Sequence, residues 1–279
     1  MSRELTKILE KKSNIARQKI IKVTTEVGSG HLAGSLSCID ILIGLYFSVL
    51  KHKPDNPNWE NRDRFIMSKG HGAPALYVVL AMSGYFPEDE LFTLRKINSR
   101  LQGHPDCKKL PGIEISTGSL GQGFSAAVGM ALGYKYDGKK NSQIYCLLGD
   151  GECDEGQIWE AVMFASSYDL KNITAIIDRN GYQIDGKTED VMKLEPLDLK
   201  WKSFGWEVEE VDGHDINEII NTLEKSRGKR VVVTANTIKG KGVSFLENNN
   251  TYHAKPCCQE DCERAINELS KKYELIGGL

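Results

Sequence analysis

Short, wholly apolar segments alternate with amphipathic ones through the second half of the chain. Residues 143–148 (QIYCLL), 173–178 (ITAIID) and 231–235 (VVVTA) lack the polar alternation of a half-exposed strand. Such runs are typical of strands in a parallel sheet whose two faces are both covered. The segments 155–168 and 216–225 between them are predicted as helices. The alternation predicts an α/β fold with a doubly wound, mostly parallel sheet and helices on both faces.

The first half of the chain supplies further elements of the same kind. Apolar spacing predicts a helix over 4–26 and a strongly apolar, buried helix over 37–50. Residues 64–68 (RFIMS) are predicted as a short buried strand and residues 73–83 as a helix of small side chains. Residues 206–211 complete the set of strands. No repeat or linker divides the sequence, so residues 1–279 are predicted to form a single domain.

Charge and hydropathy exclude several classes of partner. The chain carries 36 Lys and Arg against 38 Asp and Glu, a net charge of -2, which gives no electrostatic footprint for nucleic acid. The longest apolar run, 39–50, contains Asp40 and is too short to cross a bilayer. Neither a nucleic acid nor a membrane is expected as a partner.

The cysteines indicate the compartment. Seven are present, and the first 12 residues are charged and unlike a signal peptide. Reduced thiols in the cytoplasm are the simplest interpretation. Cys257, Cys258 and Cys262 are predicted as surface thiols on a late helix, with a metal site as the weaker alternative because no second cysteine pair completes one.

Oxygen donors follow two consecutive strands of the predicted sheet. Gly149-Asp150-Gly151 comes directly after 143–148, and Asn180 comes after 173–178. Ligands of open parallel sheets bind beyond the carboxyl ends of the strands. A carboxylate and an amide oxygen are ligands that Mg²⁺ prefers, and a diphosphate would supply the remaining oxygens. The alternative is a pair of turns with capping residues.

The wider sequence resembles the N-terminal half of transketolases. The matching segments lie between about residues 15 and 256, in the order of the family, and end with His253. They are GSGHLAGSLSCIDIL (28–42), DRFIMSKGHGAPALY (63–77), GHPD (103–106), STGSLGQGFSAAVGMALGYK (116–135), GDGECDEGQIWEA (149–161), DRNGYQIDG (178–186) and TIKGKG (237–242).

The resemblance implies thiamine diphosphate and Mg²⁺ as cofactors, with Ca²⁺ or Mn²⁺ able to substitute. It implies that Asp150, Asn180 and the backbone carbonyl of Tyr182 hold the metal. For Lys239 the alternative is a solvated loop residue. The implied cofactor-binding residues are Lys69, His71, Gly118, Ser119, Leu120, Gly149, Asp150, Gly151, Asn180, Ile184, Lys239 and His253.

The resemblance also implies the catalytic residues. Four histidines fall on its motifs and would position sugar hydroxyls and shuttle protons, namely His31, His71, His104 and His253. Glu155 matches a glutamate that links two cofactor sites near the dimer interface, the alternative being a charge at a helix N-terminus. His52 and His214 match no motif and are predicted at the surface. Glu152 is predicted as an ordinary helix-start acid.

A complete transketolase is more than twice as long as this chain. Its second half supplies a pyrimidine-binding domain, and only 23 residues follow Pro256 here. We therefore expect the N-terminal subunit of a split transketolase, in an α₂β₂ assembly with a C-terminal subunit. Such an enzyme transfers a two-carbon ketol unit between sugar phosphates.

Three alternatives stay open from the sequence. The first is another thiamine diphosphate enzyme, such as a deoxyxylulose-phosphate synthase or the α subunit of a 2-oxo-acid dehydrogenase. The second is a non-catalytic scaffold subunit of the same fold, although a scaffold would have no need of Asp150, Asn180 and the histidines. The third is a nucleotide-binding protein, which GDGE at 149–152 disfavours because it is neither G-x-G-x-x-G nor a Walker loop.

Overall fold

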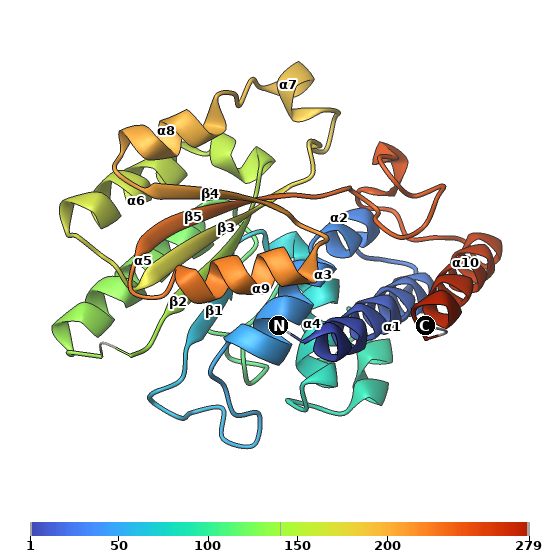
Figure 1. Ribbon diagram of the computed structural model, residues 1–279. Coiled ribbons are helices and arrows are strands. Elements are labelled where there is room, and N and C mark those ends of the chain that lie inside the picture. Colours follow the sequence, from blue (N-terminus) through green and yellow to red (C-terminus); the bar gives the residue numbers. More distant parts are fainter. Residues whose placement is uncertain (1, 140, 278–279) are drawn as a thin grey trace.

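The computed structural model describes residues 2–139 and 141–277. Five strands of this part form one sheet in the order β1-β2-β3-β5-β4, and every neighbouring pair is parallel. The predicted α/β class is therefore confirmed (Figure 1). The strands are β1 (Arg64–Met67), β2 (Ile144–Gly149), β3 (Ile173–Arg179), β4 (Glu207–Asp212) and β5 (Arg230–Asn236).

Helices cover both faces of the sheet, as the wholly apolar strands require. Helices α5 (Gln122–Tyr136), α6 (Gly156–Ser167) and α8 (Leu197–Ser203) lie on one face. Helix α9 (Ile216–Lys225) lies on the other, because the chain reaches the edge at β4 and turns back to β5. The connection from β4 to β5 runs across the sheet in the direction opposite to the earlier connections. Because crossovers are right-handed, its helix α9 lies on the opposite face.

Two apolar clusters fill the space between the sheet and its helices. Leu147 and Ile176 belong to the cluster beneath the N-terminal helices and α9. Their neighbours Leu148 and Ile177 belong to the second cluster, together with Trp201 of α8. Successive strand residues thus point to opposite faces and are buried on both, which explains why these strands show no polar alternation.

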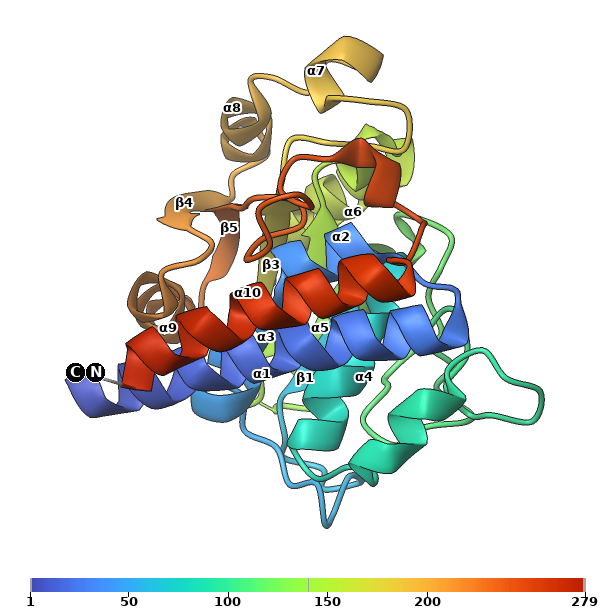
Figure 2. The ribbon, with the colours of Figure 1, turned by 90° about the vertical axis from the view of Figure 1, so that its right-hand side faces the viewer.

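The two ends of the chain pack together. Helix α1 (Arg3–Val27) begins at Ser2, whose hydroxyl accepts a hydrogen bond from the N–H of Leu5, and ends at Gly28 with φ of 67°. Helix α10 (Gln259–Gly277) lies alongside it in the opposite direction (Figure 2). Asn14 of α1 donates a buried hydrogen bond of 3.0 Å to the carbonyl of Leu269.

The predicted single helix over 37–50 is wrong in detail. The chain forms α2 (Leu32–Ser37), α3 (Ile39–Gly44) and a π-helical turn η1 (Leu45–Val49). Cys38 breaks the first two apart with ψ of 3°, and the N–H of Leu50 reaches back five residues to Leu45. An apolar pattern cannot report these breaks, because α2 and α3 are wholly buried and η1 is buried at Leu45, Tyr46 and Val49.

The remaining elements are the buried helix α4 and several short helical turns. Helix α4 follows β1 as predicted, with its first turn tightened into a 3₁₀ segment. These elements are η2 (Gly70–Gly72), α4 (Ala73–Met82), η3 (Glu88–Thr93), η4 (Gly151–Asp154), α7 (Thr188–Val191) and η5 (Asn250–Tyr252).

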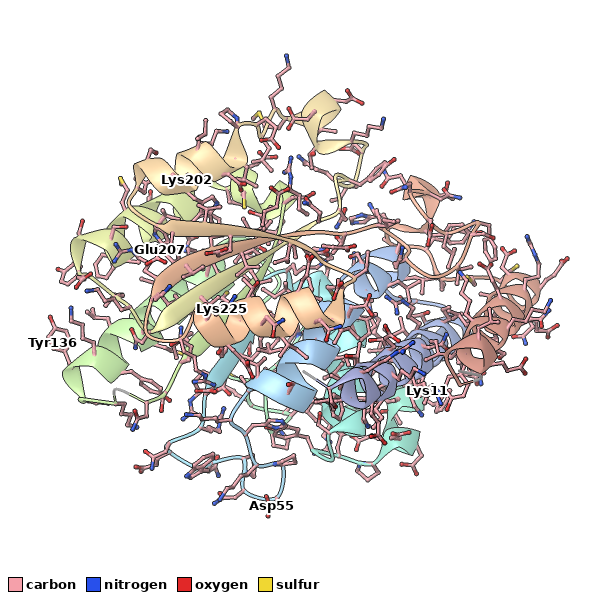
Figure 3. All side chains as sticks on the ribbon, in the orientation of Figure 1. Lys11, Asp55, Tyr136, Lys202, Glu207 and Lys225 are labelled. Atoms are coloured by element: carbon pink, nitrogen blue, oxygen red, sulfur yellow. The ribbon has the colours of Figure 1, made fainter. Side chains whose placement is uncertain are left out.

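Charged side chains gather on the outer surface, as Lys202, Glu207 and Lys225 illustrate (Figure 3). None of the helices in the described ranges is both long and apolar enough to span a membrane. All seven cysteines are free thiols, as expected. Cys258 is exposed as predicted, but it precedes the late helix α10 instead of lying on it. The prediction of surface thiols is wrong for Cys257 and Cys262, which are buried against the core.

Candidate active site

The segments that follow β1, β2, β3 and β5 surround a cavity of about 400 Å³. Because the strands are parallel, their carboxyl ends meet at one edge, where Gly149 pairs with Asp178 and Asp178 with Ala235. The cavity is lined by His31, Gly34, Lys69, His71, His104, Gly118, Leu120, Gly149, Asp150, Gly151, Glu152, Asn180, Tyr182, Gln183, Ile184, Asp185, Lys239 and His253.

Asp150 and Asn180 face this cavity from neighbouring strands. The Asp150 carboxylate accepts hydrogen bonds from the N–H groups of Gly151 (2.8 Å) and Gly181 (2.6 Å). The Asn180 amide oxygen accepts one from the N–H of Tyr182 at 3.1 Å. Burial, and then the neighbouring charge of Asp178, raises the pKa of Asp150 to about 6. A cation would relieve this unfavourable burial of a carboxylate.

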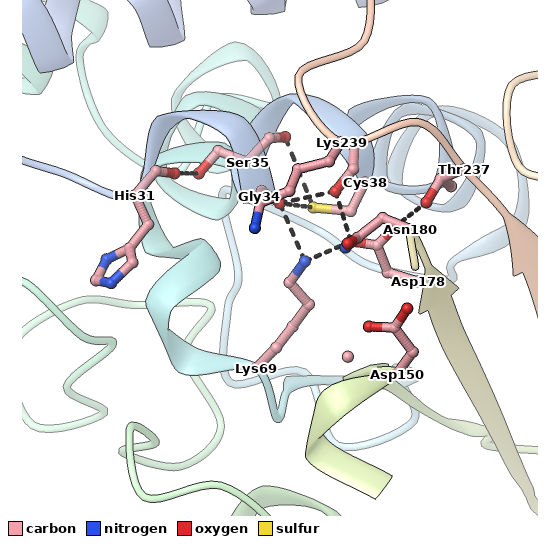
Figure 4. Close-up of polar contacts among 12 residues, drawn as sticks. His31, Gly34, Ser35, Cys38, Lys69, Asp150, Asp178, Asn180, Thr237 and Lys239 are labelled. Carbon is pink, nitrogen blue, oxygen red and sulfur yellow. Dashed lines mark hydrogen bonds and ion pairs between the residues drawn. The ribbon is translucent and has the colours of Figure 1, made fainter. Parts of the chain in front are cut away.

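A buried ion pair lies behind Asp150. Lys69 donates to the carbonyl of Gly34 at 3.0 Å and pairs with the Asp178 carboxylate (Figure 4). Ser37 donates to the same carboxylate at 2.6 Å, and Thr237 does so as well. Although burial opposes its charged form, Asp178 holds the pKa of Lys69 above its usual value. Lys69 therefore presents a permanent positive charge in the cavity wall.

Lys239 supplies a second buried ammonium group. Its side chain donates to the carbonyl of Gln183 (3.3 Å) and to the amide oxygen of Asn250 (2.6 Å), and lies 2.8 Å from Nδ1 of His253. Burial, and then the charge of Lys69, lowers the pKa of Lys239 to about 8. The alternative of a solvated loop residue is wrong, because Lys239 is only 1% exposed.

Four histidines from separate segments meet in the cavity. The ring of His31 lies 5.2 Å from that of His71, 6.5 Å from His104 and 5.5 Å from His253, measured between centroids. Burial is the first cause that lowers the pKa of each, to about 4 for His31 and His253. They are therefore neutral near pH 7 and able both to donate and to accept protons.

The cavity fits a diphosphate with a divalent cation. Two buried ammonium groups, a carboxylate and an amide oxygen match the charges of such a pair. A side chain at Gly151 would approach the Cγ of Gln183 within 2.8 Å, so glycine leaves the backbone open there. Nδ1 of His31 is buried without a partner among the described residues, which points to a ligand that completes its hydrogen bonding.

Comparison with known protein families gives a match to the family described as "Transketolase, thiamine diphosphate binding domain" over residues 10–274. The chain belongs to the transketolase family. This confirms the resemblance indicated by its motifs.

Transketolase relatives of two lengths are similar to this chain. "6-Deoxy-6-sulfo-D-fructose transketolase subunit SqwG" of Clostridium sp. (strain MSTE9) is 46% identical over 267 residues, 95% of this chain and 97% of that protein. One of the subunits of an apulose-4-phosphate transketolase, from Phocaeicola vulgatus, is 42% identical over 271 residues, 96% of each chain. "Transketolase" of Homo sapiens is 39% identical over 269 residues, 95% of this chain but 42% of that protein.

The fold matches solved transketolase structures. The transketolase of Campylobacter jejuni superposes with a TM-score of 0.90 at 34% identity, covering 97% of this chain and 43% of that one. The chain thus spans less than half of the length of this solved relative. The fold predicted from the resemblance is confirmed.

Most residues that the transketolase resemblance implied lie in the cavity wall. Two do not. Ser119 is exposed between Gly118 and Leu120, which both line the cavity, and Glu155 is exposed at the start of α6. Ile184 lines the mouth with 71% of its surface exposed. In the described part of this single chain, Glu155 and Ser119 are therefore outside the cavity.

The predicted site residues leave out four residues that line the cavity: Gly34, Glu152, Gln183 and Asp185. Glu152, predicted as an ordinary helix-start acid, is instead buried, and its carboxylate accepts hydrogen bonds from the N–H groups of Gly121 and Gly149. Burial raises its pKa. Gln183 and Asp185 lie in the same motif as Asn180 and Ile184. Their place in that motif was the feature of the sequence that could have predicted their position in the cavity wall.

The surface roles predicted for His52 and His214 are wrong. His52 is half-buried, with its ring nitrogens 3.1 Å from the Tyr85 hydroxyl and 2.8 Å from the carbonyl of Tyr46. His214 is half-buried against Asp40, 2.7 Å from its carboxylate. The partners of His214 lie far away in the sequence, so no local pattern marks it.

Proposed function

We propose that this chain is the N-terminal, thiamine diphosphate-binding subunit of a split transketolase. With Mg²⁺, the enzyme would transfer a two-carbon ketol unit from a ketose phosphate donor to an aldose phosphate acceptor. The observation that carries this proposal is the placement of Asp150 and Asn180 at adjoining strand ends, in one cavity with two buried lysines and four histidines. Similarity to transketolases favours it over the other thiamine diphosphate enzymes and over a scaffold.

Three groups would hold the metal: the Asp150 carboxylate, the Asn180 amide oxygen and the backbone carbonyl of Tyr182. Ca²⁺ or Mn²⁺ would substitute for Mg²⁺ because these donors are all hard oxygens. Lys69 and Lys239 would balance the diphosphate charge. Gly118 and Gly151 would let the backbone approach it, and Leu120 and Ile184 would border its apolar parts. When bound, thiamine diphosphate supplies the nucleophilic carbon and accommodates the electron pair released by carbon–carbon cleavage.

The histidines of this chain would act on the sugar. Breaking a bond beside a ketose carbonyl requires a proton to leave a hydroxyl group, and forming one requires a proton to return. His31, His71, His104 and His253 are neutral near pH 7, so each can accept a proton at one nitrogen while donating from the other. Their closeness would let one group serve as base and its neighbour orient the hydroxyl.

A separate C-terminal subunit would complete the active site, in an α₂β₂ assembly with the cofactor at the interface. Relatives of this length are named as transketolase subunits, whereas the human enzyme is more than twice as long as the matching region. Glu155, exposed beside the cavity-lining loop, would meet a partner chain and link two cofactor sites. The free thiols of the chain support a reducing compartment such as the cytoplasm.

Reconstitution tests this function. The chain would be purified and mixed with the product of a neighbouring reading frame that resembles the missing half. Ketol transfer would be assayed with thiamine diphosphate, Mg²⁺ and a panel of ketose phosphate, sulfonated ketose and aldose substrates. Transfer by the pair, and by neither protein alone, is expected. Absence of transfer by the pair with every substrate would contradict the proposal.

A further inference from the structure

The loop that carries Lys239 is tied from behind to a buried carboxylate. Lys239 lies between Ile238 and Gly240, in the segment 237–242 that follows β5. The N–H of Ile238 donates a hydrogen bond of 2.9 Å to Nε2 of His214. A backbone N–H can only donate, so Nε2 accepts and the imidazole proton resides on Nδ1. That nitrogen lies 2.7 Å from Asp40, to which it donates.

A second connection reaches the same loop from the same carboxylate. Arg17 of α1 pairs with Asp40, and its Nε donates to the carbonyl of Lys241 at 3.1 Å. Burial opposes the charge of Asp40, but Arg17 and the His214 hydrogen bond hold its pKa well below the usual range. The backbone on both sides of Lys239 is therefore fixed to one charged group.

Packing of the loop supports this arrangement independently of the hydrogen bonds. Gly242 has φ of 103°, and a side chain there would come within 2.8 Å of the Arg17 Cδ. Gly240 donates its N–H to the carbonyl of Ala33 at 3.0 Å, and a side chain at Gly240 would clash with the backbone of Leu246. The glycines let the loop lie directly on Arg17 and on helix α2.

We propose that Asp40, His214 and Arg17 form a clamp that positions Lys239 for a diphosphate, an inference that rests on the proposed function. None of the three lines the cavity, so each acts through the backbone of the loop and is a positioning residue. The clamp holds the Lys239 ammonium group, on a long flexible side chain, in one place before a ligand arrives. Preorganisation of this kind increases affinity by reducing the ordering required on binding.

Two conservative variants separate positioning from simple stability. In His214→Asn the amide nitrogen stands near the position of Nδ1 and keeps Asp40 paired, but the side chain is too short to reach Ile238. In His214→Gln the amide oxygen reaches the position of Nε2 and restores the acceptor for Ile238. His52→Asn is the matched control, because His52 is also half-buried and hydrogen-bonded but contacts Tyr46 and Tyr85 instead of the loop.

The first readout needs no cofactor. Hydrogen exchange of the free chain would be followed on peptides covering 237–242, with β2 and β3 as internal references. We expect about tenfold faster exchange in this segment for His214→Asn, as for the loss of one hydrogen bond. His214→Gln regains the acceptor for Ile238 but not the bond to Asp40, so its rate should lie between those of His214→Asn and wild type, and His52→Asn should exchange at the wild-type rate. Equal rates in all four proteins would overturn the clamp.

The second readout is the Kd of thiamine diphosphate at saturating Mg²⁺, measured on the chain assembled with its partner subunit. We expect His214→Asn to bind about tenfold more weakly and His214→Gln to recover most of the affinity. His214→Asn should weaken binding little further when Lys239→Met is already present, because the two changes act through one group. Additive losses, or wild-type affinity for His214→Asn, would overturn the clamp alone. Failure of the wild-type assembly to bind thiamine diphosphate would instead overturn the proposed function and this inference with it.

Discussion

Glu152 Oε1 accepts a hydrogen bond of 2.9 Å from the backbone N–H of Gly121, a residue 31 positions earlier in the chain. Its second oxygen accepts one of 3.0 Å from the N–H of Gly149. The carboxylate thus joins the end of β2 to the turn that begins α5, in the wall of the cavity. Ser68, at the end of β1, donates to it as well.

Removal of this carboxylate should destabilise the chain. Glu152→Ala leaves two buried N–H groups without acceptors, and we expect a loss of about 3 kcal/mol in the free energy of unfolding. Glu152→Gln keeps one acceptor oxygen and should lose less. Urea unfolding at pH 7 measures both, with Glu160→Ala on the exposed face of α6 as the control. A Glu152→Ala chain as stable as the control would contradict this role.

Because Lys69 and Asp178 form a buried ion pair, substitutions of the two residues should have non-additive effects on the free energy of unfolding. Lys69→Met leaves the carboxylate buried without its partner, and a loss of about 3–5 kcal/mol in unfolding free energy is expected. Adding Asp178→Asn removes that charge while keeping an oxygen for Ser37 and Thr237. The double variant should therefore be more stable than Lys69→Met. If it is less stable, the charge of Asp178 is not what Lys69 compensates.

The histidine cluster makes the stability of the free chain depend on pH. The folded chain keeps His31, His71 and His253 neutral, since burial lowers the pKa of each, to about 4 for His31 and His253. Histidines of the unfolded chain bind protons near pH 6.5. The unfolded state therefore binds more protons below that pH, and stability falls as the pH drops from about 6.5 toward 4.

His71→Asn removes one of these histidines and should make the loss of stability at acidic pH less steep. Urea midpoints measured between pH 8 and pH 5 give the slope, and above pH 7.5 the two proteins should run parallel because the imidazoles are neutral in both states. The same acid slope in both proteins would show that His71 does not resist protonation in the folded chain.

Substitution by alanine should change the stability of the chain in opposite directions at two glycines of α5. A side chain at Gly123 would come within 2.7 Å of the Ser68 backbone, whereas one at Gly129 meets nothing within 4 Å. Gly129→Ala should stabilise the free chain by about 1 kcal/mol through helix propensity. Gly123→Ala should destabilise it by about 1–3 kcal/mol through overpacking. Thermal unfolding distinguishes the two, and a stabilised Gly123→Ala would show that the helix shifts freely away from β1.

Local patterns were enough to predict the sheet and the two oxygen donors at its edge. The wholly apolar runs that become β2, β3 and β5 indicate strands buried on both faces. Asp150 and Asn180 follow directly after the first two of these strands. Parallel pairing then brings these residues to one edge without further information. The histidines and Lys239 were predicted instead from the motifs that the chain shares with the family.

The burial of Glu152 and of His214 could not be predicted from the sequence, because it depends on partners far away along the chain. Glu152 is separated from Ser68 by 84 positions, and His214 from Asp40 by 174. Both looked like surface residues because a polar side chain is buried only when the fold supplies its partners. The break at Cys38 escaped detection for a different reason, since the apolar pattern continues unchanged across it.

The most direct test of the account is Mg²⁺-dependent binding of thiamine diphosphate by the chain with its partner subunit, measured by calorimetry for wild type and Asp150→Asn. Asp190→Asn, exposed on α7, is the control. We expect wild type and the control to bind only when Mg²⁺ is present, and Asp150→Asn to bind about a hundredfold more weakly with its circular dichroism spectrum unchanged. Binding that does not depend on Mg²⁺, or that Asp150→Asn leaves at wild-type affinity, would contradict the assignment of this cavity.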